Sequence, residues 1–213
     1  MYGSINEIYY AGLDFGNGVG EGDPTSISVI RYNPENNCKE KVYGCELHED
    51  YPQQIQHILQ LFSGPRPRFA CKRIGADYTG CGRPVVQMLI ESGLTNLMGI
   101  IFNARDTITG SRTSFKTSMY HILLQEISYD TFKYPDLEHF KASAGNANLF
   151  YYHKCLSQYD SLIIEHRERI NPSIYNPDGH DDVPDSDAIA LFQFYIDKKR
   201  SSMPKGASYH ASR

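Results

Sequence analysis

Three segments that should be buried in the folded chain each lie beside aspartate, and this pattern constrains the fold more than any other feature. Residues 8–13 run into Asp14, residues 69–76 run into Asp77, and Asp181-Asp182 opens an apolar helix. Carboxylates at the ends of buried segments are costly unless a cation compensates them. Several that converge on one point would repel one another and would favour divalent cations. Two-metal phosphoryl chemistry requires such an arrangement.

Hydrophobic periodicity predicts an α/β fold with a mixed sheet. The expected strands are residues 8–14, 25–32, 40–47, 69–76 and 97–102, and the expected helices are residues 51–62, 84–92, 117–127, 135–141 and 185–199. Residues 149–156 suit a helix or a strand, residues 162–170 suit an exposed strand, and residues 176–179 form a turn. The first three strands favour an antiparallel meander, and the later alternation of strand and helix favours parallel pairing through right-handed crossovers.

The composition suits a single soluble domain. We expect residues 1–200 to form that domain and residues 201–213 to be a basic, disordered tail. No apolar run approaches a bilayer span and no leader is evident, which predicts a cytosolic protein. The five cysteines form no C-x-x-C pair and are expected to be reduced.

The formal charge of −4 argues against a generally basic nucleic-acid binder, although bound metal would neutralise several acids. The distribution of basic residues is more informative than their sum. The candidates for contacts with DNA phosphates, near the second acidic segment and after the next strand, are Lys72, Arg73, Arg83, Arg105, Arg112 and Lys116.

Each acidic segment also has alternative interpretations. Residues 14–18 suit a metal ligand with a glycine turn, the phosphate-binding turn of an actin-like or sugar-kinase ATPase, or an ordinary hairpin. Asp77 precedes a glycine turn and a helix, where an acid is often only a cap. Asp182 and Asp185 would share a helix face, although they also suit a charged surface N-terminus. Three interpretations apply to His180: it orients an acid, it contacts a phosphate, or it makes a local hydrogen bond.

These motifs resemble those of a known family. Residues 12–16 with 22–29, residues 74–82 and residues 179–186 are similar to three motifs of the C-terminal nuclease domain of the large terminase subunit of tailed bacteriophages, a relative of RNase H and RuvC-like nucleases. Residues 112–125 fall where these nucleases carry a basic residue and a helix. Ser186 and Asp187 depart from the family's small and apolar residues, and no P-loop motif of an ATPase motor is present.

The resemblance implies an RNase H-like fold and a metal-dependent endonuclease that cuts concatemeric viral DNA during genome packaging. Asp14, Asp77 and Asp182 would be catalytic, with Asp14 bridging two Mg²⁺ or Mn²⁺ ions; Asp181 and Asp185 are further candidate metal ligands, and His180 is a possible accessory residue. The implied partners are double-stranded DNA, the terminase ATPase domain, the small terminase subunit and the portal, in the host cell cytoplasm. A Holliday-junction resolvase of the same fold, an ATP-binding protein and a docking module are the alternatives.

Overall fold

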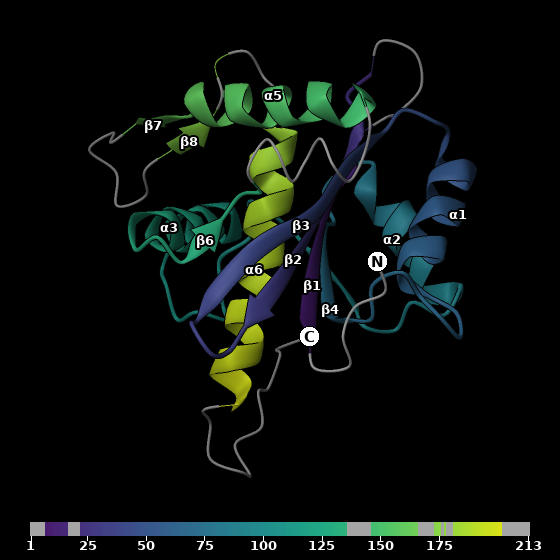
Figure 1. The fold of residues 1–213 in the computed structure, drawn as a ribbon, viewed down its shortest axis with the longest axis horizontal. Coiled ribbons are helices and arrows are strands. Elements are labelled where there is room, and N and C mark those ends of the chain that lie inside the picture. The colour runs from purple at the N-terminus through teal and green to yellow at the C-terminus, as the bar shows by residue number, and fades with distance from the viewer. Residues whose placement is uncertain are drawn as a thin grey trace.

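A six-stranded mixed sheet forms the centre of the computed structural model (Figure 1), with strand order β5-β4-β1-β2-β3-β6. The structure describes residues 7–16, 22–135, 146–165, 173–175, 177 and 181–201. The sheet strands are β1 (Ile8–Asp14), β2 (Thr25–Asn33), β3 (Cys38–Leu47), β4 (Cys71–Asp77), β5 (Leu97–Ile100) and β6 (Phe132–Lys133). Strands β1, β2 and β3 pair antiparallel, whereas β4 runs parallel to β1 and β5 runs parallel to β4. The predicted meander and parallel crossovers are therefore confirmed.

Helices cover both faces of this sheet. They are α1 (Tyr51–Phe62), α2 (Gly82–Glu91), α3 (Phe115–Ser128), α5 (Asn146–Asp160) and α6 (Asp182–Ser201). Helices α1 and α2 lie on one face, and α6 and α3 lie on the other, while α5 crosses the N-terminal end of α6 (Figure 1). A small second sheet pairs β7 (Ile163–Glu165) with β8 (Ser173–Tyr175).

Alternation along the central strands divides the core into two halves. Tyr9, Ala11 and Leu13 of β1 pack with α1 and α2, whereas Tyr10 packs with α6 on the opposite face. Successive side chains of a strand point to opposite faces, so the even-numbered positions of β1 face α6. Asp14 therefore belongs to the face that α6 covers.

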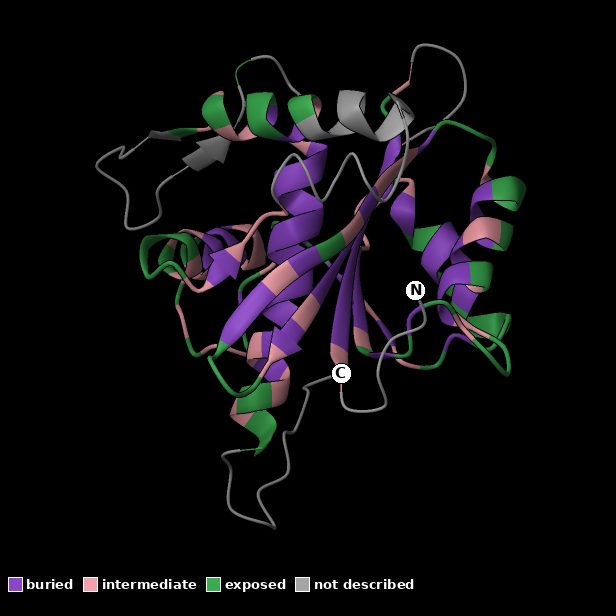
Figure 2. Cartoon of the chain, viewed as in Figure 1, coloured by how far each residue is buried: buried purple, intermediate pink, exposed green. Residues whose placement is uncertain are grey.

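Helix α6 is the most deeply buried helix of the described chain. Its residues from Asp182 to Phe194 are all buried, and only its C-terminal end reaches solvent (Figure 2). It begins at Asp182, three residues earlier than predicted, because Pro184 falls in the first turn, where the missing N–H costs nothing. The alternative of a charged surface N-terminus is wrong, since Asp182, Asp185 and Asp187 are all buried.

The remaining predictions have mixed outcomes. Residues 149–156 lie within the helix α5, and the expected strand at 162–170 is described only over Ile163–Glu165. The short helix expected at 135–141 and the turn at 176–179 lie outside the described residues apart from Pro135 and Pro177, as does the tail from residue 202. The five cysteines are free thiols, as predicted.

Candidate active site

Two strands present the same Gly-x-Asp pattern to helix α6. A Cβ atom at Gly12 would lie 2.0 Å from the backbone oxygen of Ser186, and one at Gly75 would lie 2.6 Å from Cγ2 of Ile189. Only glycine allows the helix to come this close to the sheet. Asp14 and Asp77 follow these glycines by two residues, so their side chains emerge on the same face, next to the N-terminal turn of α6.

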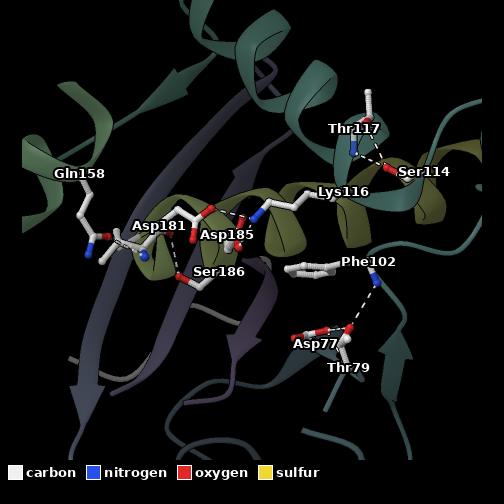
Figure 3. A network of polar contacts seen from close by, with 11 residues as sticks. Asp77, Thr79, Phe102, Ser114, Lys116, Thr117, Gln158, Asp181, Asp185 and Ser186 are labelled. Atoms are coloured by element: carbon white, nitrogen blue, oxygen red, sulfur yellow. Dashed lines mark hydrogen bonds and ion pairs between the residues drawn. The ribbon is translucent and has the colours of Figure 1, made fainter. Parts of the chain in front are cut away.

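The N-terminal turn of α6 supplies three further carboxylates, from Asp181, Asp182 and Asp185. The backbone N–H of Asp185 donates to the carbonyl of Asp181 at 2.8 Å, which closes the first helical turn. The N–H of Val183 donates to Oε1 of Gln158 on α5 at 2.9 Å, so α5 holds this turn in place (Figure 3). The site thus combines the ends of two parallel strands with the start of a helix that crosses them.

The carboxylates interact strongly. Burial raises the pKa of Asp14 well above its usual range, and the charge of Asp185 adds the largest electrostatic contribution, ahead of Asp77 and Asp182. Burial also raises the pKa of Asp185 to about 7, although Lys116 lowers it and Asp181 raises it. Like charges held close together disfavour ionisation of each member. The charges of Asp77, Asp182 and Asp185 thus all act on Asp14.

A lysine compensates part of this negative charge. Nζ of Lys116 lies 2.7 Å from Oδ2 of Asp181 and 2.9 Å from Oδ2 of Asp185 (Figure 3). Lys116 is the second residue of α3, which starts at the Ser114 cap, and its backbone N–H donates to the carbonyl of Phe102. The other oxygen of Asp185, Oδ1, is buried and has no hydrogen-bond partner.

Asp77 is held by its own turn. Its Oδ1 accepts hydrogen bonds from the backbone N–H of Thr79 at 2.9 Å and from the Thr79 hydroxyl at 2.6 Å. Burial raises the pKa of Asp77, and these hydrogen bonds oppose the increase. The hydrogen bonds leave Oδ2 of Asp77 for a further interaction at the site.

Asp182 lies in different surroundings from Asp185. Burial raises its pKa to about 6, and the groups that act on it electrostatically are Asp23, Lys154, Asp181 and Glu46. Nζ of Lys154 on α5 lies 2.7 Å from Oε1 of Glu46 on β3, which places this part of the site under α5. The charge of Asp185 raises the pKa of Asp14 more than the charge of Asp182 does, so Asp185 is the α6 carboxylate that acts most strongly on Asp14.

Of the six predicted phosphate-binding residues, Lys116 is paired with Asp181 and Asp185, and the other five divide into two groups. Arg83 lies exposed in the first turn of α2, 5.6 Å over the ring of Tyr78 and just beyond Asp77, and Arg105 and Arg112 are exposed in the segment between β5 and α3. Lys72 and Arg73 lie at the opposite end of β4 from Asp77. There Lys72 pairs with Asp197 at 2.8 Å and Arg73 donates to Gln193, so the structure does not bring these two to the carboxylates.

A buried network behind the site was not anticipated. Asp187 is fully buried and pairs with Nζ of Lys41 at 2.9 Å, and it accepts hydrogen bonds from Ser28, Tyr134 and Tyr159. Ser186 meets Ser26 across the same interface, Oγ to Oγ at 3.0 Å. Ser186 and Asp187, which stand where the family carries small and apolar residues, thus have polar partners in this chain. His180 lies outside the described residues.

The described residues contain no group of three or more Asp, Glu, His or Cys side chains arranged to hold a metal ion as they stand. Several of these carboxylate oxygens have other partners. Lys116 pairs with Asp181 and Asp185, and Thr79 occupies one oxygen of Asp77.

In the described part of the chain, no helix is both long and apolar enough to cross a membrane.

The strand order and the helices on each face define an RNase H-like fold. Among solved structures, the chain is similar to the large terminase nuclease of thermophilic phage G20c, with a TM-score of 0.61 and 16% identity over 90% of this chain and 84% of that one. It is also similar to the large terminase nuclease domain of bacteriophage P22, with a TM-score of 0.56 and 11% identity over 92% and 86% of the two chains.

A third similar structure is the large terminase nuclease domain of bacteriophage SPP1 with bound Mn, with a TM-score of 0.53 and 15% identity over 88% of this chain and 86% of that one. A magnesium-bound form of the G20c nuclease is similar as well. No family model matches the sequence, and no curated protein matches it by sequence. At these identities the similarity establishes the fold.

Proposed function

We propose that this chain is a divalent-metal-dependent endodeoxyribonuclease of the large-terminase type, which cuts concatemeric viral DNA during genome packaging. One observation supports it above all: at one edge of an RNase H-like sheet, the buried Asp14 at the end of β1 has its pKa raised by burial and by the charges of Asp185 and Asp182 on α6 and of Asp77 on β4. Such mutually destabilised carboxylates are typical of functional sites. Solved structures with this fold include terminase nucleases with bound Mg or Mn.

The donor chemistry of these residues suits two Mg²⁺ or Mn²⁺ ions, although the described side chains are not arranged to hold an ion as they stand. All candidate ligands are carboxylate oxygens, the donors that these hard cations prefer. Oδ1 of Asp185 and Oδ2 of Asp182 are each buried without a hydrogen-bond partner, and a cation would satisfy either oxygen. We assign Asp14, Asp77 and Asp185 as the central ligands, with Asp181 and Asp182 beside them, which moves the α6 catalytic role from Asp182 to Asp185. Two ions held by these residues would lower the pKa of an attacking water and stabilise the leaving 3′ oxygen.

The chain's own residues hold the substrate and fix the geometry. Asp14 lies on the central strand of the sheet, between β2 and β4, and is therefore held rigidly. Arg83, Arg105 and Arg112 are exposed on segments that follow β4 and β5, where they bind phosphates of double-stranded DNA without reading its sequence. By the same resemblance, the terminase ATPase domain, the small terminase subunit and the portal are its partners in the host cell cytoplasm.

Nicking of supercoiled plasmid tests the proposal. Wild-type protein, Asp14→Asn and Asp185→Asn are each incubated with Mn²⁺, Mg²⁺ or EDTA. Asp197→Asn is the matched control, because Asp197 lies at the opposite end of α6 and pairs with Lys72. We expect metal-dependent nicking by wild type and by the control, and none by the two site variants.

Activity retained by Asp14→Asn would contradict the assignment of the site. A strong preference of the wild type for four-way junctions over plasmid would support the resolvase alternative instead.

A further inference from the structure

Lys116 holds the position of a cation between two acids of the candidate site. Its ammonium contacts Asp181 and Asp185 at 2.7 and 2.9 Å, and the three side chains point toward one another from α3 and the start of α6 (Figure 3). The Asp185 side chain is 5% exposed, so its negative charge is poorly solvated and depends on this partner. A single ammonium thus neutralises a pair of carboxylates that would otherwise repel each other.

The ammonium of Lys116 holds one particular oxygen of Asp185, Oδ2, at 2.9 Å. Divalent cations bind carboxylate oxygens at about 2.0–2.6 Å, so a divalent cation that takes Oδ2 would lie close to the ammonium. Two cations that share one oxygen repel strongly in a partly buried site. Coordination through Oδ2 would therefore displace the ammonium.

Lysine is suited to that movement. Its side chain is 24% exposed and flexible, and its ammonium lies 5.5 Å from the ring centroid of Phe102 and 5.7 Å from that of Tyr120. Aromatic faces accept an ammonium at these distances. The ammonium can therefore leave Asp185 while keeping a favourable contact.

Given the proposed nuclease site, we propose that Lys116 is an internal counter-ion that exchanges with the divalent cation at Asp185. It stabilises the metal-free protein and weakens metal binding, because a divalent cation that takes Oδ2 of Asp185 must displace it. The exchange links metal affinity to a residue that is not itself a ligand.

Calorimetric titration of the full chain with Mn²⁺, at about pH 8 so that carboxylates are ionised, tests the exchange. Lys116→Met removes the charge and keeps the length of the side chain. Lys116→Arg keeps the charge, and Lys72→Met removes an equal charge from an ion pair at the far end of α6. Thermal melting in EDTA provides a second readout that requires no metal.

We expect Lys116→Met to bind Mn²⁺ on the order of tenfold more tightly than wild type and to melt at a lower temperature in EDTA. Lys116→Arg and Lys72→Met should keep an affinity near that of wild type. If wild type binds Mn²⁺ and Lys116→Met binds it equally or more weakly, the exchange is overturned while the nuclease site stands. If neither binds at millimolar Mn²⁺, the metal site itself is absent and both proposals fail.

Discussion

Asp182 and Asp185 lie three residues apart on one helix, yet they belong to different electrostatic surroundings. Asp185 pairs with Lys116 and dominates the charge felt by Asp14, whereas Asp182 interacts with Asp23, Glu46 and Lys154 under α5. Three residues along a helix leave two side chains about 60° apart around the axis and about 4.5 Å apart along it, so they share a face but can meet different neighbours. The roles of Asp182 and Asp185 are therefore assigned separately.

Replacement of each acid by its amide should separate their roles. Asp185→Asn should abolish metal-dependent nicking and most of the thermal stabilisation by Mn²⁺, because it removes a central ligand. Asp182→Asn should retain a measurable part of both, since Asp182 faces Lys154 and Glu46. Melting with and without Mn²⁺, followed by plasmid nicking, measures this. Equal losses in the two variants would show that Asp182 is as central as Asp185.

The raised pKa values also predict how stability depends on pH. Asp182 and Asp185 have pKa values of about 6 and about 7 in the folded protein, above their ordinary value of 3.8. The folded state therefore binds these protons more tightly than the unfolded state. Their contribution to stability is fully present below the unfolded pKa and is lost as the pH rises through the folded values.

Metal-free protein should accordingly melt at lower temperature as the pH rises from about 4 to about 7, and Mg²⁺ should restore stability at the upper end of this range. Melting curves in EDTA and in Mg²⁺ at stepped pH values measure the effect. Asp185→Asn, which removes one of the titrating groups, should show a flatter profile in EDTA. A melting temperature that rises throughout this range in EDTA would contradict the prediction.

At the scale of elements, the site depends on how closely α6 approaches the sheet. Gly12 faces the backbone of α6 at Ser186 and Ala190, whereas Gly75 faces the side chains of Ile189 and Gln193. Backbone atoms of a buried helix cannot yield without moving the helix, but side chains can change rotamer. The two glycines should therefore differ in their tolerance of a methyl group.

Gly12→Ala should lower the free energy of unfolding by about 3 kcal/mol or more, and Gly75→Ala by a smaller amount. Gly12→Ala should also reduce Mn²⁺ binding, because the displaced helix carries Asp185. Urea denaturation measures the stabilities, and calorimetry measures the metal binding. A Gly12→Ala protein as stable as wild type would show that α6 packs less closely than the structure indicates.

At the scale of the whole molecule, Asp187 joins parts of the chain that are distant in sequence. Its carboxylate contacts Lys41 of β3, Ser28 of β2, Tyr159 of α5 and Tyr134, which follows β6. Both members of the ion pair are almost wholly buried, with side-chain exposures of 1% for Lys41 and 0% for Asp187. This network attaches α5 and the sheet to the helix that carries Asp185.

Removing one member of that pair should cost much more than removing both. Asp187→Ala should destabilise the protein by about 3–5 kcal/mol, because it leaves the Lys41 ammonium buried without its counter-charge. The double variant Lys41→Met with Asp187→Ala should be less destabilised than the sum of the single variants. A urea-denaturation double-mutant cycle measures this coupling. Additive effects would mean that the two side chains do not depend on each other.

The local pattern of the sequence was sufficient for most of the fold. Alternating apolar residues predicted the five main strands, and the apolar spacing from Tyr51 to Phe62, with its stop at Gly64-Pro65, placed α1 at its observed bounds. Asp14 and Asp77 were identifiable because each ends an apolar strand. The Gly-x-Asp pattern at residues 12–14 and 75–77 is a further sequence signal that Asp14 and Asp77 share one face of the sheet.

The tertiary structure decided what the sequence left open. Which acid of α6 faces Asp14 depends on the rotation of the helix over the sheet, and local spacing does not specify that rotation. The same holds for Lys116, which reaches Asp185 from 69 positions away, and for Lys72 and Arg73, which parallel pairing places at the far end of β4. Local sequence patterns specify which helices and strands form and which of them end in an acid. The packing of α6 against the sheet specifies which charged side chains meet, because electrostatic interactions depend on distances in space rather than along the chain.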